Sequence, residues 1–248
     1  MRQLLSCQSF LYARQFYETW LEKLAVAADW CGVLTLACND NLAKRQHKIQ
    51  QQPFALSGLF SPVTKEQASQ IAGLELPYDG LFFPTAGWLC PQDYCQQMAN
   101  WLSSQGVEII YNTQVHQITE LEQYCELETS AGTLHATTVV LATGAQLNAL
   151  AQQESFQLLQ ISGQVSHLQS MTMTQLKTVV CHQGYITPAH QQLHCVGATF
   201  DRSSGHSEVL AEDNQQNLDL VNQTLGQPEW FEDVEVMSAK AGLRATVP

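Results

Sequence analysis

A lone arginine near the end of the chain has the chemistry to hold an anionic ligand. Arg244 lies between apolar residues in Ala241-Gly242-Leu243-Arg244-Ala245-Thr246, a segment typical of a strand. A guanidinium group that faces a cavity can bind a carboxylate through two parallel hydrogen bonds, whereas one on the surface more commonly forms an ion pair. The pattern alone leaves both interpretations open.

A second candidate is a turn of small residues that follows an apolar run. Residues 138–142 read as a buried strand that leads into Ala142-Thr143-Gly144. Such a turn lets the backbone approach a ligand at the carboxyl end of a strand, where open α/β sheets bind ligands, although the same pattern also fits an ordinary strand and loop. No two of the fourteen glycines have G-x-G spacing, so the sequence contains no loop that would cradle a dinucleotide pyrophosphate.

No catalytic side chain and no metal site can be assigned from spacing. His167, His182 and His194 alternate with apolar residues on expected strands, which favours structural roles. The eight cysteines include no C-x-x-C pair, and Cys90 and Cys95 lack the second pair that a zinc site needs. We interpret all eight as reduced thiols, which predicts a cytoplasmic protein.

The charge is unevenly divided along the chain. The formal net charge is −12, with seven Lys/Arg and four Asp/Glu in residues 1–65 but four Lys/Arg and nineteen Asp/Glu in residues 66–248. An acidic bulk repels phosphate and argues against general nucleic-acid binding. A local phosphate contact could come from the basic cluster of Lys44, Arg45 and Lys48, for which the alternative interpretation is a solvated helix face.

These candidates must be positioned by a mixture of helices and strands. Helices are predicted over residues 10–28, 40–51, 65–73, 91–104 and 208–225, with Asn39 or Asp40 capping the second and a capping box at residues 64–67 starting the third. Strands are predicted over residues 32–37, 80–83, 107–111, 115–142 (three strands with a turn at 130–132), 164–168, 178–181, 185–187, 194–200 and 234–247. This order indicates an α/β (α+β) fold with a sizeable antiparallel sheet. We expect no membrane span and no signal peptide.

Six short strings resemble one family in their residues and in their order. They are residues 29–33 (Asp-Trp-Cys-Gly-Val), 83–91 (Phe-Pro-Thr-Ala-Gly-Trp-Leu-Cys-Pro), 139–144 (ending Leu-Ala-Thr-Gly), 163–167 (Gly-Gln-Val-Ser-His), 184–188 (Gly-Tyr-Ile-Thr-Pro) and 242–246 (Gly-Leu-Arg-Ala-Thr). From about Phe10 onward the chain resembles the C-terminal FAD-dependent oxidoreductase part of the tRNA 5-methylaminomethyl-2-thiouridine biosynthesis bifunctional proteins. That part belongs to the glycine and D-amino-acid oxidase superfamily. The strings around Trp88 and Gln164 are fairly specific to the tRNA enzymes.

The resemblance implies a D-amino-acid-oxidase-like substrate domain with an antiparallel sheet, plus a remnant of the FAD-binding domain. We expect residues 1–248 to be a partial FAD-dependent amine-oxidase domain that is cut short at both ends. Its substrate-side sheet should lie mainly in residues 30–105 and 155–245, and its FAD-side remnant at about 106–150. The family's G-x-G-x-x-G half and last flavin-binding segment have no counterpart in the sequence. This stretch by itself is therefore expected to bind FAD weakly or not at all, and to be inactive.

The resemblance also implies an activity. In this family FAD oxidises the C–N bond of a carboxymethylaminomethyl group on the tRNA wobble uridine, and a methyltransferase domain that uses S-adenosylmethionine then methylates the product. By position, Arg244 corresponds to the arginine that binds the substrate carboxylate, and Tyr185 to a tyrosine of the same pocket. No side chain is required as a strong base.

Other positions correspond to cofactor contacts, and the basic cluster gives a separate hypothesis for tRNA. Val115, Ala142, Thr143 and Gly144 correspond to flavin contacts, made largely through the backbone. The Lys44 cluster would contact tRNA phosphates. Two alternatives stay open, a free-standing glycine- or sarcosine-type amine oxidase and a non-catalytic substrate-docking module.

Overall fold

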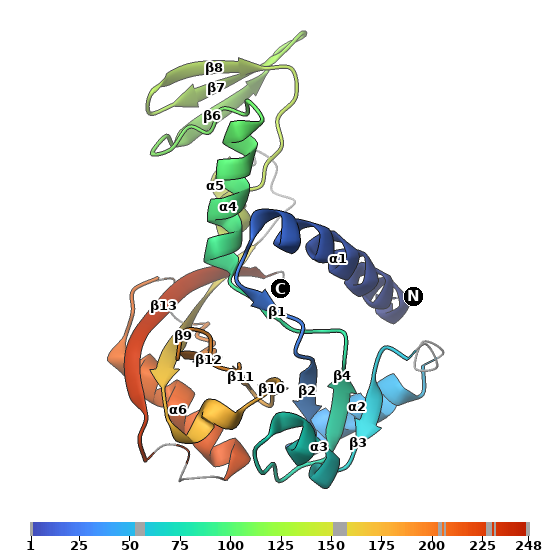
Figure 1. The fold of residues 1–248 in the computed structure, drawn as a ribbon. Helices are drawn as coiled ribbons and strands as arrows, with labels where there is room; N and C mark the ends of the chain where they lie inside the picture. Colours follow the sequence, from blue (N-terminus) through green and yellow to red (C-terminus); the bar gives the residue numbers. More distant parts are fainter. Residues whose placement is uncertain are drawn as a thin grey trace. The chain divides into compact units, whose positions relative to one another are not determined.

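The computed structural model describes residues 2–52, 58–150, 158–202, 205, 207–226, 230 and 232–246, with the side chains of residues 2–7, 145, 148 and 149 left out. The chain forms two compact units (Figure 1). Unit 1 comprises Met1–Ser104, Gln164–Thr199 and Val209–Lys240. Unit 2 comprises Gln105–Gly163, Phe200–Glu208 and Ala241–Pro248.

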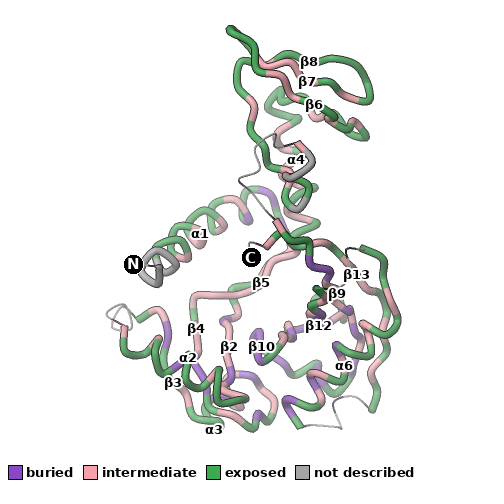
Figure 2. The backbone as a smooth tube through the Cα atoms, turned by 180° about the vertical axis from the view of Figure 1, so that it is seen from behind, coloured by how far each residue is buried: buried purple, intermediate pink, exposed green. Residues whose placement is uncertain are grey.

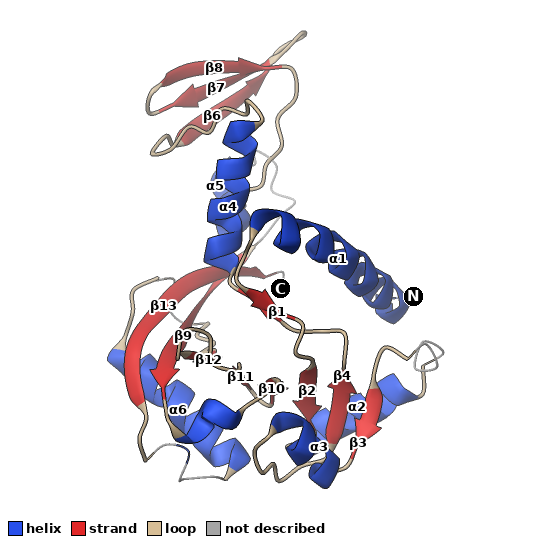
Figure 3. Ribbon diagram, in the orientation of Figure 1, coloured by secondary structure: helices blue, strands red, loops and turns tan. Residues whose placement is uncertain are grey.

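One eight-stranded sheet contains most of the strands (Figure 3). Its strands are β2 (Val33–Leu36), β3 (Ser61–Val63), β4 (Gly80–Phe83), β9 (Leu159–Gln169), β10 (Val179–Cys181), β11 (Tyr185–Ile186), β12 (His194–Gly197) and β13 (Glu235–Thr246). The order is β13-β9-β12-β11-β10-β2-β4-β3, and β10 pairs with β2 in parallel while β9, β12, β11 and β10 are successively antiparallel, as are β2, β4 and β3. The predicted antiparallel sheet is therefore confirmed.

Two helices supply the apolar cover of this sheet. Helices α3 (Lys65–Ala72) and α6 (Ala211–Leu225) share one core with the sheet strands. Its buried members are Leu34, Leu36, Ala68, Ala72, Leu76, Leu168, Met173, Leu176, Val180, Ile186, Val196, Val221, Leu225 and Trp230. Figure 2 shows this burial along β2, β10 and α6. Each fully buried aliphatic side chain contributes about 2 kcal/mol to folding, so this core is the main stabilising feature of unit 1.

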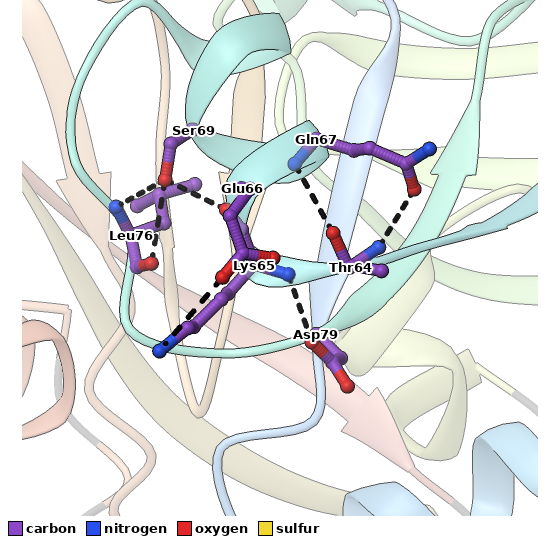
Figure 4. Close-up of polar contacts among 7 residues, drawn as sticks. All are labelled: Thr64, Lys65, Glu66, Gln67, Ser69, Leu76 and Asp79. Carbon is purple, nitrogen blue, oxygen red and sulfur yellow. Dashed lines mark hydrogen bonds and ion pairs between the residues drawn. The ribbon is translucent and has the colours of Figure 1, made fainter.

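The ends of α3 follow from its sequence (Figure 4). The Thr64 hydroxyl accepts a hydrogen bond from the Gln67 backbone N–H at 3.4 Å, and the Gln67 side-chain oxygen accepts one from the Thr64 N–H at 2.9 Å. This reciprocal pair satisfies two amides that a helix leaves without partners at its start. Gly73 ends the helix with φ +77°, a left-handed conformation that favours glycine. Helix α2 (Asp40–Gln50) is capped by Asn39, as predicted.

The first helix is longer than predicted and ends earlier. Helix α1 runs over Arg2–Leu24, and Ala25 follows it with φ +53°. It packs against α4 (Pro91–Ser104) near β1 (Ala28–Asp29) and β5 (Trp88–Leu89). The Trp20 and Trp101 rings meet edge to face at 4.6 Å, and the Lys23 ammonium lies 4.6 Å and 4.2 Å from their centroids. Such cation–π contacts strengthen the packing of the two helices.

A buried polar network fixes α6 to β9. The Gln164 side chain, fully buried, donates to the Leu210 carbonyl at 2.8 Å and to the Asn214 side chain at 2.9 Å, and it accepts from the Leu210 N–H at 2.8 Å. Ser166 donates to Asn214 at 2.7 Å, and Asn217 donates to the Gln164 carbonyl and to Ser166, both at 3.1 Å. Buried amides are tolerated when they are paired in this way. The network therefore sets where α6 begins on the sheet.

Unit 2 contains a separate three-stranded antiparallel sheet. Its strands are β6 (Val115–Glu120), β7 (Cys125–Thr129) and β8 (Gly132–Ala136), joined in the order β6-β7-β8. The short helices η2 (Gly144–Gln146) and α5 (Leu147–Leu150) follow, and η3 (Thr172–Gln175) lies in unit 1. The three strands and their turn were predicted correctly, although the last one ends at Ala136.

Two predicted strands of unit 2 are wrong. Residues 107–111 and 138–142 have no strand structure. Several of their apolar side chains lie in solvent, including Tyr111 at 66% and Val140 at 83% exposure. A strand exists only where a neighbour accepts and donates its ladder hydrogen bonds, and no strand in the described part of the chain pairs with either segment. Both have the composition of buried strands without the partner that would bury them.

Candidate functional site

Arg244 shares one aromatic ring with a second arginine in unit 2. The Arg244 guanidinium carbon lies 5.8 Å from the Phe200 ring centroid, and that of Arg202 lies 5.5 Å from the same centroid. Both distances are within the range of a cation–π contact. Phe200 is 51% exposed and both arginines are exposed. Arg244 therefore lies on the surface of its unit and not in a closed cavity, and the ring holds the two cationic groups in one place.

Strand β9 explains this convergence. Ser162 of β9 and Asp201 form an isolated antiparallel bridge, with two backbone hydrogen bonds of 3.0 Å. Side chains two residues apart on an extended segment point to the same side, which puts Phe200 and Arg202 on one side and Asp201 on the other. Strand β13 pairs with the opposite edge of β9 and carries Arg244. The arginines thus approach the ring from segments that flank the same strand.

Tyr185 lies in unit 1, on the short strand β11. Its hydroxyl is 4.0 Å from the Cys195 sulfur of β12. Burial raises the pKa of the Cys195 thiol, with a smaller effect in the same direction from Cys90. The structure therefore brings Tyr185 and Cys195 together and places Cys90 within electrostatic range of them, and this thiol stays protonated at neutral pH. Tyr185 and Arg244 belong to different units, so each is placed only within its own.

The ring of Trp88 lies near the same strands. Trp88 contacts the His190 ring at 5.2 Å between centroids. The Trp88 indole nitrogen is buried, with no hydrogen-bond partner among the described residues. The string around Trp88 thus contacts His190, which lies two residues after the string that contains Tyr185.

Two histidines of unit 1, His182 and His194, are buried. Burial lowers the pKa of His182 to about 4, and its Nδ1 accepts a hydrogen bond from the Gly184 N–H at 3.2 Å. Burial also lowers the pKa of His194, whose Nδ1 lies 2.8 Å from the Thr187 carbonyl. Both rings are neutral at pH 7 and face backbone groups. Neither has the position of a general base.

The turn at residues 142–144 has two features that would suit a ligand contact. Gly144 has φ +54°, and a side chain added there would meet no atom within 4 Å. The Thr143 hydroxyl is buried, with no partner among the described residues. Helix α5, which follows the turn, contacts β6, the strand that begins at Val115 with a bulge. Open space at Gly144 and an unsatisfied hydroxyl at Thr143 fit a polar ligand that approaches the backbone closely.

The basic cluster lies on α2. Lys44, Arg45 and Lys48 are all exposed, within one turn of the helix. The buried Gln46 donates to the Thr35 carbonyl at 2.7 Å and fixes the opposite side of α2 to β2. The three cations therefore face solvent on a helix that is itself anchored, a geometry that suits either a phosphate contact or a solvated face.

Two partners in these clusters were missed from the sequence. Phe200 is the last residue of the strand predicted over residues 194–200, and Arg202 lies two residues further on; the observed strand ends at Gly197. Their spacing and the scarcity of cations after residue 65 were the available signals.

Over the described residues, no group of three His, Cys, Asp or Glu side chains could hold a metal ion, and no helix is long and apolar enough to cross a membrane. The seven cysteines with described side chains are free thiols.

Curated relatives carry one name. The chain is 32% identical over 241 residues to the tRNA 5-methylaminomethyl-2-thiouridine biosynthesis bifunctional protein MnmC of Shewanella amazonensis, covering 95% of this chain and 36% of the relative. The protein of the same name from Aeromonas salmonicida is 33% identical over 241 residues, with the same coverage. The chain thus spans about a third of the length of these relatives.

Solved structures agree on the fold. Glycine oxidase from Geobacillus kaustophilus superposes with a TM-score of 0.84 at 20% identity, covering 96% of this chain and 66% of that structure. L-proline dehydrogenase from P. horikoshii gives 0.79 at 16% identity, with the same coverage. The mixed α/β fold is therefore that of the glycine-oxidase-like enzymes, as the sequence predicted. The family model of FAD dependent oxidoreductases (DAO) matches residues 4–248, and the chain belongs to this family.

Proposed function

We propose that this chain is part of an FAD-dependent oxidoreductase that removes the carboxymethyl arm from 5-carboxymethylaminomethyl(-2-thio)uridine at the tRNA wobble position. The observation that carries the proposal is the identity of 32% over 95% of the chain to proteins named for this modification. The strings around Trp88 and Gln164, which are fairly specific to those proteins, occupy β5 and β9 of unit 1.

Arg244 is proposed to bind the substrate carboxylate. The arm to be removed is an N-substituted glycine, whose carboxylate a guanidinium fork can grip through two hydrogen bonds. The exposure of Arg244 and its place beside the Phe200 ring support this role, because an anion can reach it without crossing the core of unit 2. Tyr185 is proposed as a second substrate-binding residue.

The flavin contacts are proposed at Val115, Ala142, Thr143 and Gly144. The unsatisfied Thr143 hydroxyl and the open space beside Gly144 support this assignment. When bound, FAD would supply the oxidising chemistry: a hydride would leave the C–H bond of the carbon attached to the amine nitrogen, and the C–N bond would be oxidised to an imine. The residues of this chain would hold and orient the reactants. By this proposal residues 106–150 are the FAD side, and residues 30–105 and 155–245 mainly the substrate side.

The partners are proposed from the relatives. Their name is that of a bifunctional protein. This supports the presence, on the same polypeptide, of a methyltransferase domain that uses S-adenosylmethionine. tRNA would contact Lys44, Arg45 and Lys48, the exposed cations of α2. Neutralising all three should weaken tRNA binding and lower its salt dependence, because fewer counterions would be released. An unchanged salt dependence would remove this contact from the proposal.

Deletion of the gene that encodes this chain tests the reaction. Nucleosides from total tRNA of the deletion strain, measured by mass spectrometry, should accumulate carboxymethylaminomethyluridine and lose its demodified products. The complete wild-type gene should restore the products, whereas the same gene with Arg244→Ala should not. A nucleoside profile that the deletion leaves unchanged contradicts the proposed function.

A second candidate is a glycine-type amine oxidase that acts on small molecules. The superposition on glycine oxidase with a TM-score of 0.84 favours it. The protein made from the complete gene would then oxidise free glycine or sarcosine with release of hydrogen peroxide, and the tRNA of the deletion strain would be normal. The tRNA reaction predicts the opposite result in both assays.

The visible spectrum of the purified chain tests the third interpretation, a non-catalytic docking module. Because the sequence has no G-x-G-x-x-G loop, we expect a colourless protein from which added FAD is removed by desalting. Flavin bands that stay with the protein through desalting would show that the chain holds FAD by itself and would contradict this expectation.

A further inference from the structure

The two arginines beside Phe200 match the two kinds of anionic group on one substrate nucleotide. We infer that Arg202 binds a phosphate of the substrate, and that it thereby lets the site distinguish an N-substituted glycine carried by a nucleotide from a free one. The inference rests on the proposed function, in which Arg244 binds the carboxylate. It adds a specificity-determining residue to that site.

The charge distribution of unit 2 singles out this position. By sequence, the ranges that make up unit 2 contain eight Asp/Glu and only two Lys/Arg, which are Arg202 and Arg244. Both converge on one phenyl ring. The acidic remainder of unit 2 repels a polyanion, so a phosphate would contact unit 2 at this point.

The geometry suits phosphate recognition. Phe200 and Arg202 lie on the same side of an extended segment that the Ser162–Asp201 bridge ties to β9. The ring lies 5.5 Å from the Arg202 guanidinium carbon, which restricts the movement of a long side chain before any ligand arrives. A planar guanidinium so restricted can meet two phosphate oxygens at once, which a lysine ammonium cannot do. Phe200 is thus a positioning residue for both arginines.

The chemistry of the substrate divides the two roles. The carboxymethylaminomethyl arm ends in a carboxylate, and the nucleotide that bears it has phosphates on its ribose. Free glycine and sarcosine have the carboxylate alone. Arg244 therefore contributes to the binding of both classes of molecule, whereas Arg202 contributes to the nucleotide only.

Binding measurements separate these contributions. The probes are 5-carboxymethylaminomethyluridine and its 3′,5′-bisphosphate, titrated by calorimetry, at low salt and with excess FAD, into the protein made from the complete gene. The wild-type protein should bind the bisphosphate about tenfold more tightly than the nucleoside, the effect of roughly one charge-assisted contact. Arg202→Ala should reduce this ratio to within about twofold of one and leave nucleoside affinity unchanged. Arg202→Lys should retain part of the ratio, and Phe200→Leu should lower it.

The control is Lys177→Ala, which removes one exposed positive charge from unit 1 and should leave the ratio unchanged. Thermal melting of each variant checks that it is folded. Three results would contradict the inference. They are equal affinity of the wild-type protein for the nucleoside and the bisphosphate, no binding of the bisphosphate at all, and a ratio of the two affinities that Arg202→Ala leaves unchanged. Nucleoside binding that Arg244→Ala does not weaken contradicts the proposed function instead, so the two failures are distinguishable.

Discussion

The two units differ in how completely their apolar segments are paired and buried. In unit 1 the apolar strands are paired, α3 and α6 cover one core, and a buried amide network joins α6 to β9. In unit 2 the small sheet is paired, but residues 107–111 and 138–142 have no strand partner among the described residues, and most of their side chains are exposed. This difference shows that an apolar segment is buried only where the fold places a strand or helix beside it. Stability should therefore be concentrated in unit 1.

The largest expected effect compares one buried and one exposed aliphatic residue. Leu168→Ala empties a fully buried position in the core of unit 1 and should lower the free energy of unfolding by about 2–5 kcal/mol. Val140→Ala in unit 2, where the side chain is 83% exposed, should change it by less than about 0.5 kcal/mol. Urea unfolding followed by circular dichroism measures both. Equal losses would end the contrast between the units.

The amide network should give the next largest effect. Gln164→Ala leaves the Leu210 backbone groups and Asn214 without their buried partner, which should cost about 2–3 kcal/mol and speed hydrogen exchange at the start of α6. Gln169→Ala, at a half-buried position of the same strand, removes one long contact of 3.5 Å and is the control. If the two variants are equally stable, the network does not hold α6.

Acid should weaken unit 1 through His182. Its folded-state pKa is about 4, below the usual 6.5, so the unfolded chain takes up a proton first as the pH falls. The contribution of neutral His182 to the free energy of unfolding is complete above pH 6.5 and is lost as the pH falls towards 4. Between pH 7.5 and pH 5 the loss should be about 2 kcal/mol. In His182→Gln the decline over this range should be smaller by that amount. An identical decline in both proteins would show that this ring is not buried as described.

The smallest effect is expected at Gly144, with Gly80 as the comparison. Gly144→Ala in unit 2 meets no neighbouring atom, and only its φ of +54° should matter, at a cost of about 1 kcal/mol. Gly80→Ala in unit 1 places a methyl group against the Thr35 carbonyl of the paired strand and should cost more. Thermal melting ranks the two variants. The reverse order would mean that the turn at Gly144 is more crowded than the ladder at Gly80.

Local signals predicted most of the fold. The capping box at Thr64, the start of α4 at Pro91 and the alternation along β9 each depend on neighbouring residues, so they could be identified from the sequence. The lack of a strand at residues 138–142 could not be predicted, because a strand needs a pairing partner and the local sequence does not show whether one is present. The string around Gln164 was interpreted as a family signature, and the structure shows that its amide side chain holds α6.

Less of the candidate site could be predicted. Arg244 was identified by resemblance, but its proximity to Arg202 depends on β9 lying between their two segments, forty residues apart in the chain. The Tyr185 neighbourhood likewise needs the contact of β11 with β12 and the approach of Cys90. Such long-range pairing is a property of the sheet order, which residue spacing does not determine.

The exposed apolar segments of unit 2 have a consequence for the behaviour of the protein at high concentration. Residues 139–142 are Val-Val-Leu-Ala, an uncharged run that contains β-branched residues and has unpaired backbone groups. Such a run is a template for intermolecular β-pairing, and it acts between copies as readily as within one. Light scattering of the isolated chain should therefore rise steeply with concentration, and a charged residue in place of Val140 should delay that rise without altering the melting temperature.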